Sequence, residues 1–235
     1  MRIQHPFVSA KSDGGDATLV RPLNWNEGHF RVPESQGGLY DPFDTTDTSD
    51  PVSGLTMLGS PDVFDANSTA KGHLVVKESG SGSVNIVGGY KTWSPSAGQY
   101  VETWLTDAVF HPSNSSYVGM FIGEAGGTGK FCLVGLGRYA TAWDDKLIVF
   151  NYNSRTSFAS EPASVTGPWR PPFGLRVVYN SSTSIDVYMS HGIGWRKLVS
   201  AVNPGSFTPA IVGLGGDMSA SSFTTEAYFD YLNNG

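Results

Sequence analysis

Residues 173–198 read FGLRVVYNSSTSIDVYMSHGIGWRKL, and this stretch decides the fold class. Apolar and polar side chains alternate from Ile185 to Ser190, which is the pattern of a strand with one buried face. Turn-forming residues flank that run at 180–183 and 191–194, so the chain is expected to reverse direction on both sides of it. The stretch therefore predicts antiparallel strands joined by short hairpins.

Similar short runs recur on both sides of this stretch, separated by turn clusters such as residues 126–129. We expect strands near residues 73–77, 84–87, 99–105, 116–122, 131–137, 146–151, 173–180, 184–190, 195–199, 210–214 and 225–232. No convincing amphipathic helical pattern occurs after residue 54. This many short strands predict an all-β fold in which two antiparallel sheets form a sandwich.

The length allows one large β domain or two small ones, and the composition excludes two kinds of partner. The chain has 235 residues, of which 39% are hydrophobic and 12% aromatic, enough for a sizeable core. The net charge of −6 comes without any basic block, so we expect no nucleic-acid binding. No apolar stretch reaches the roughly 20 residues of a membrane span, so no membrane insertion is expected. The single cysteine, Cys132, stands in an apolar run and is expected to be a buried side chain.

The first 53 residues differ from the rest of the chain. Residues 1–32 are dense in turn formers but carry several apolar side chains, which a freely solvated tail does not need. We interpret them as an arm that orders against another surface. Residues 33–53 are rich in Pro, Gly, Ser, Thr and Asp and form a linker. The sandwich is then expected to occupy residues 54–235.

The arm resembles the opening segment of structural proteins of tailed bacteriophages. The resemblance rests on His5, Ser9–Lys11, Asp13–Asp16, Thr18–Pro22 and Trp25–His29. It implies a virion protein, assembled in the host cytoplasm, whose arm binds other virion proteins. The residues expected to anchor the arm are His5, Lys11, Asp13, Asp16, Arg21, Trp25, Asn26 and His29. Packing of the arm on its own sandwich is the alternative.

The region 73–235 resembles the concanavalin-A-like, or laminin-G-like, jelly roll. A strand pair is followed by a Gly-Trp hairpin ending at Trp195, by the strand 211–216 and by a closing strand, Ala227–Leu232, that contains Phe-Asp-Tyr. The resemblance implies a jelly-roll sandwich. It specifies the fold better than the function, because the same fold carries many activities.

Catalytic motifs are missing from the sequence, and we therefore expect no enzyme. Glycosidases on this fold carry two carboxylates on one strand, about 5.5 Å apart in retaining enzymes. The nearest arrangement here is Glu226 with Asp230, which are expected to be solvent-facing positions. No serine nucleophile elbow or phosphate-binding loop is present either.

Metal sites have little support in the sequence. The five histidines, at positions 5, 29, 73, 111 and 191, are scattered, which argues against zinc. We expect no cofactor, except that the jelly-roll resemblance allows calcium bound by loop carboxylates. The pair Asp144–Asp145 is the most suggestive, and two solvated turn residues are the alternative.

Aromatic residues beside polar ones suggest a glycan site, since sugar rings stack on aromatic faces while polar groups bind their hydroxyls. The candidate residues are Tyr139, Trp143, Asp144, Asp145, Trp169 and Arg170. Packing in the core or in an interface is the alternative for the tryptophans.

The function predicted from these features is adhesive. We expect a tail-fibre or receptor-binding component that is anchored by its arm and displays a sandwich to host-surface glycan. A homotrimer is the expected assembly. Two alternatives remain open: a capsid decoration or head-fibre protein, and a polysaccharide-degrading glycosidase or lyase on the same fold.

Overall fold

The computed structural model describes residues 54–66, 73–80, 82–110, 115–139, 142–218 and 224–235. The predicted arm (1–32), its anchoring residues and the linker (33–53) lie outside these ranges. Within the described ranges, no helix is long and apolar enough to cross a membrane.

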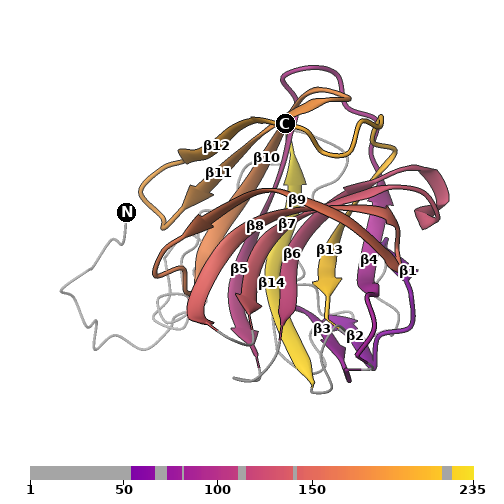
Figure 1. The fold of residues 1–235 in the computed structure, drawn as a ribbon, viewed down its shortest axis with the longest axis vertical. Coiled ribbons are helices and arrows are strands. Elements are labelled where there is room, and N and C mark those ends of the chain that lie inside the picture. Colours follow the sequence, from indigo (N-terminus) through magenta and orange to yellow (C-terminus); the bar gives the residue numbers. More distant parts are fainter. Residues whose placement is uncertain (1–53, 67–72, 81, 111–114, 140–141, 219–223) are drawn as a thin grey trace, which may run out of the picture. The chain divides into compact units, whose positions relative to one another are not determined.

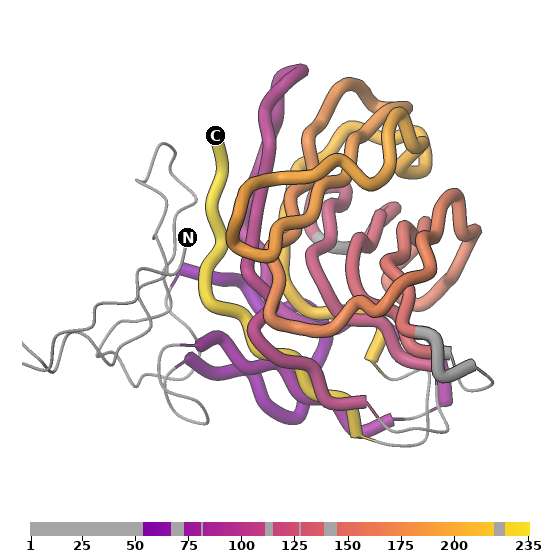
Figure 2. The backbone as a smooth tube through the Cα atoms, turned by 90° about the vertical axis from the view of Figure 1, so that its left-hand side faces the viewer, coloured from indigo at the N-terminus to yellow at the C-terminus, as the bar shows by residue number. Residues whose placement is uncertain are grey.

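Two seven-stranded antiparallel sheets form a sandwich, which confirms the predicted fold class (Figure 1). The first sheet has the order β1 (Thr56–Leu58), β4 (Ile86–Thr92), β13 (Ile211–Asp217), β6 (Ser116–Gly123), β7 (Phe131–Tyr139), β8 (Ala142–Ser154) and β9 (Ser157–Thr166). The second has the order β12 (Arg196–Val202), β11 (Ser184–Ser190), β10 (Phe173–Ser181), β5 (Tyr100–Val109), β14 (Thr225–Asn234), β3 (Leu74–Glu78) and β2 (Val63–Ala66). In Figure 2 the yellow strand β14 lies in a different layer from the red strands β7 and β8.

All eleven predicted strands are present, and the structure adds three more. The added strands are β1, β2 and β9, and each stands at the edge of its sheet. An edge strand is paired on one side only and often carries polar or proline residues that protect it. The strand β9 contains Pro162 and is largely exposed, so it lacks the alternating apolar pattern that reveals inner strands.

The main core lies between the two sheets. Alternate residues of the inner strands supply it, including Leu105 and Phe173 from the second sheet and Met120 and Val134 from the first. Cys132 is fully buried in this core, as predicted, and burial raises the pKa of its thiol. A buried thiol in such surroundings behaves as a small hydrophobic side chain.

A second apolar cluster covers the opposite face of the first sheet, so this sheet is buried on both sides. Its members are Leu58, Ile86, Phe121, Phe131, Leu133, Ile148, Phe150, Tyr152 and Ile211. Several rings meet edge to face, such as Phe121 and Phe131 with centroids 5.9 Å apart. Such pairs add stability beyond the area that they bury.

Four glycines stand side by side across the middle of this face. The register aligns Gly88, Gly215, Gly119 and Gly135 on β4, β13, β6 and β7. A Cβ atom on Gly215 would lie 2.0 Å from the carbonyl oxygen of Val87. The neighbouring backbones therefore approach more closely than any residue with a side chain permits.

The turn between β8 and β9 reaches the start of β4, on the other side of the first sheet. Arg155, in the turn between β8 and β9, accepts a hydrogen bond at its carbonyl oxygen from Ile86 N at 2.9 Å, and its Nη1 donates to Asn85 Oδ1 at 2.6 Å. In Figure 1, β8 and β9 sweep across the view toward the side on which β1 and β4 lie. The curled hairpin thus encloses the second apolar cluster.

A buried hydrogen bond ties the same hairpin to β13. The Tyr152 hydroxyl donates to Asp217 Oδ2 at 3.2 Å, and Asn85 N donates to Asp217 Oδ1 at 2.9 Å. Burial raises the pKa of Asp217, although both hydrogen bonds oppose the shift. Burial and the nearby Asp217 also raise the pKa of Tyr152, which keeps its hydroxyl proton available for this bond.

A charged network lies on the other face of the second sheet from the core. Arg176 on β10 stands opposite Glu102 on β5, which in turn stands opposite Asn233 on β14. The Arg176 Nε and Nη2 groups donate to Glu102 Oε2 at 2.8 and 2.5 Å, and Asn233 Nδ2 donates to Oε1 at 3.2 Å. The guanidinium carbon lies 4.1 Å from the ring centre of Tyr100 and 4.2 Å from that of Trp195.

Candidate functional site

A pocket of about 360 Å³ lies where the end of β8 and the start of β9 meet the loop that follows β12. This volume falls in the range of small-molecule sites, about 300–1,000 Å³. Its lining is mostly amide, hydroxyl and small apolar groups: Lys130, Asn151, Tyr152, Asn153, Ala159, Ser160, Pro162, Asn203, Gly205 and Ser206.

Asn151 is the most informative residue of the pocket. On β8 it follows Leu147 and Val149 on the face that packs into the main core, and its side chain is only 7% exposed. Its Nδ2 group donates to the carbonyl oxygen of Asn203 at 3.1 Å. Its Oδ1 atom is buried and accepts no hydrogen bond from the described residues. A buried acceptor without a donor costs about 1–3 kcal/mol.

The loop after β12 forms a rigid wall of the pocket. Asn203 Oδ1 accepts hydrogen bonds from the backbone N–H groups of Gly205 and Ser206, both at 2.9 Å. This asparagine turn closes the loop locally. Ser206 has a φ of +56°, a conformation that the turn imposes and that few residues other than glycine adopt. The Ser206 hydroxyl is held beside Asn203 Nδ2 at 3.1 Å.

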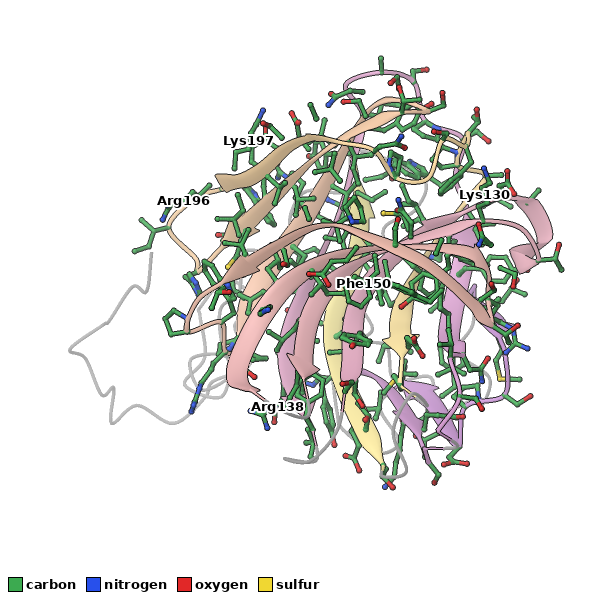
Figure 3. The ribbon with its side chains drawn as sticks, in the orientation of Figure 1. Lys130, Arg138, Phe150, Arg196 and Lys197 are labelled. Carbon is green, nitrogen blue, oxygen red and sulfur yellow. The ribbon has the colours of Figure 1, made fainter. Side chains whose placement is uncertain are left out.

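Lys130 brings a positive charge to the pocket from the residue before β7. Its Nζ donates to the carbonyl oxygen of Gly205 at 3.1 Å, which ties it to the same wall. Its backbone N donates to Glu124 Oε2 at 2.9 Å, so the short turn between β6 and β7 is also fixed. Figure 3 labels Lys130 on the right of the view.

The residues that the sequence predicted to bind glycan are not among the described residues that line this pocket. The side chains of Tyr139, Trp143 and Asp144 lie outside the described part of the chain. Asp145 is buried and pairs with Arg138, with Nε and Oδ1 3.2 Å apart. Neither residue lines the pocket.

Trp169 and Arg170, the other two predicted residues, also stand apart from the pocket. The Trp169 indole N–H donates to the carbonyl oxygen of Val165 at 2.6 Å, and the ring packs on the edge of the main core. Arg170 is exposed. These contacts of Trp169 agree with the alternative in which the tryptophans pack in the core or in an interface.

The carboxylate pair on β14 is engaged in surface contacts. Glu226 Oε1 lies 2.9 Å from Lys77 Nζ, and its Oε2 accepts a hydrogen bond from the Tyr228 hydroxyl at 2.7 Å. These bonds lower the pKa of Glu226. Among the described residues, no group of three or more His, Cys, Asp or Glu side chains is placed to hold a metal ion.

The pocket was not predicted from the sequence, although two signals for it are visible in the chain. Asn151 interrupts the apolar face of a strand at a position where a core residue is expected. The run Asn203–Ser206, with its Pro and Gly, has the composition of a tight turn that can present polar groups. Only the fold shows that these two segments meet.

No protein-family model matches the chain, and no curated protein matches its sequence. Solved structures do share its fold. A functionally unknown protein from Saccharomyces cerevisiae matches with a TM-score of 0.58 and 11% identity, over 78% of this chain and 96% of that one. A GH43 protein from Bacillus licheniformis matches with a TM-score of 0.57 and 17% identity, over 83% of this chain. This match spans only 38% of the GH43 chain.

A third similar structure comes from work on endo-acting O-glycanases that human gut bacteria express to initiate mucin breakdown. It matches with a TM-score of 0.56 and 10% identity, over 86% of this chain and 98% of that one. The solved structures that share the fold therefore include carbohydrate-active proteins. The prediction that this chain is not an enzyme is wrong at the level of the fold. Glycan-degrading proteins contain the same β-sandwich.

Proposed function

We propose that this chain is a glycan-binding sandwich and that the pocket between β8, β9 and the loop after β12 holds the sugar. The observation that carries the proposal is the buried, unpaired Oδ1 atom of Asn151. The surrounding hydroxyl and amide groups match the alternating donors and acceptors of a sugar ring. The likeness to carbohydrate-active proteins supports the same class of ligand.

Ser160→Trp is expected to abolish detectable glycan binding, because an indole at this exposed position of β9 fills the pocket mouth without touching the core. The full-length chain and the variant are compared on an array of bacterial and host-surface oligosaccharides. Ser164→Trp is the matched control, since Ser164 is also exposed on β9 but does not line the pocket. If both variants bind like the unmodified chain, the pocket is not the glycan site.

Glycan degradation is the second candidate. It is supported by the O-glycanase likeness, which extends over 98% of that chain. The oligosaccharides that bind in the array experiment are incubated with the full-length chain, and the release of shorter products is measured by mass spectrometry. New reducing ends would favour degradation, whereas intact oligosaccharides would favour binding alone.

The N-terminal resemblance supports a finer proposal, in which the sandwich is displayed on a bacteriophage virion as a tail-fibre or receptor-binding component. The arm would attach it to other virion proteins, and a trimer would present several pockets to one surface. Capsid decoration is the competing placement. Gold labelling of assembled particles with an antibody against the sandwich tests both: label on the tail supports the first, and label on the shell supports the second.

A further inference from the structure

We infer that the pocket selects glycans that carry an anionic group, an inference that rests on the proposed function. It starts from Lys130, the charged residue of the pocket lining. Its Nζ donates to the carbonyl oxygen of Gly205 at 3.1 Å, which places the ammonium group at the pocket wall. An ammonium group has three N–H donors, so two remain for a bound molecule.

No carboxylate of the described residues neutralises this ammonium group. Lys77, Arg138, Arg176 and Lys197 each form an ion pair with a described carboxylate. The other residues that line the pocket are uncharged. Glu124 is close in sequence, but its Oε2 accepts the hydrogen bond from the backbone N of Lys130. An anion that enters the pocket therefore meets a positive charge that forms no ion pair with a described carboxylate.

Asn151 Oδ1 and Lys130 Nζ can each form further hydrogen bonds, and they require different partners. Asn151 Oδ1 needs a donor, which a sugar hydroxyl provides. Lys130 Nζ needs acceptors, and a carboxylate or sulfate provides charge-assisted ones that are roughly twice as strong as neutral acceptors. A sugar residue that carries both groups, a hexuronate or a sulfated hexose, satisfies both demands. This selectivity is local, since the chain as a whole has a net charge of −6.

The test uses matched pairs of oligosaccharides that differ only in charge: oligogalacturonates with their methyl esters, and sulfated oligosaccharides with their desulfated forms. The full-length chain is expected to prefer the charged member of a pair. Lys130→Met should weaken binding of the charged member at least about tenfold more than binding of the neutral member, whereas Lys130→Arg should retain the preference. Binding by the unmodified chain should also weaken as salt is raised from about 0.05 to 0.5 M.

Arg196→Met is the control for the change in net charge, since Arg196 is exposed and lies on the opposite side of the view from Lys130 (Figure 3). Comparing the preference for the charged member in the oligogalacturonate pair with that in the sulfated pair identifies which anion the pocket binds. Equal binding of charged and neutral members, or unchanged selectivity in Lys130→Met, would overturn the inference. If Ser160→Trp still abolishes binding in that case, the proposed function stands; if it does not, or no oligosaccharide binds, both fall.

Discussion

Gly215→Ala is expected to lower the free energy of unfolding by about 2–6 kcal/mol. Gly215 has a φ of +144°, where a residue with a Cβ is strained by about 1–3 kcal/mol. The added methyl group would also lie 2.0 Å from the carbonyl oxygen of Val87. Relieving that clash requires β13 and β4 to move apart in the middle of the first sheet, and overpacking of this kind costs about another 1–3 kcal/mol. A domain stable by about 5–15 kcal/mol loses a large part of its stability.

Gly98→Ala is the matched control for this change. Gly98 also has a positive φ, +89°, but a Cβ atom there would meet no other atom within 4 Å. It therefore carries the conformational cost without the clash. Urea unfolding followed by tryptophan fluorescence gives both free energies. If the two variants lose the same stability, the close contact between β13 and β4 adds no cost beyond the backbone strain.

Arg176→Met is expected to cost about 3–5 kcal/mol, the usual loss when one partner of a buried ion pair is removed. Glu102 is only 2% exposed and receives two of its three side-chain hydrogen bonds from Arg176. Without the guanidinium group, the carboxylate keeps one hydrogen bond, from Asn233. The rings of Tyr100 and Trp195 also lose the cation that lies between them.

Two further variants separate this network from an ordinary surface ion pair. Lys77→Met breaks the pair with Glu226, whose side chains are 38% and 22% exposed, and should cost less than about 1 kcal/mol. The double change Arg176→Met with Glu102→Gln removes the unpaired charge and should recover part of the loss. A cost for Arg176→Met as small as that for Lys77→Met would show that Glu102 does not depend on its partner.

The inner strands of the second sheet, such as β10 and β11, were predictable because each has one face in the core, which imposes alternation on its sequence. The hairpin from Phe173 to Ser190 is the clearest example, and its observed turn at 182–183 lies within the predicted 180–183. The inner strands of the first sheet are buried on both faces and were predictable as short apolar runs. Edge strands lack these constraints. For this reason the sequence of β9, which contains Pro162 and is mostly exposed, resembles that of a loop.

The candidate site was less predictable because it depends on contacts between distant segments. Asn151 on β8 and Asn203 in the loop after β12 are 52 residues apart in the chain. They meet because β9 and β12 are edge strands of the two sheets, and the order of strands is not readable from alternation. The predicted cluster around Asp145 and Trp169 relied on neighbours in sequence. In the structure, Asp145 forms an ion pair with Arg138, and the Trp169 indole donates a hydrogen bond to the carbonyl oxygen of Val165.

The measurement that tests the central proposal most directly is an NMR titration of the full-length chain with an oligosaccharide that binds in the array. We expect the Asn151 side-chain amide signals and the backbone signals of Gly205 and Ser206 to shift in proportion to occupancy. The signals of Arg170 and of the Trp169 indole should stay in place. Shifts confined to Trp169, Arg170 and Asp145, with the Asn151 amide unmoved, would contradict the proposal and place the sugar in the loop cluster.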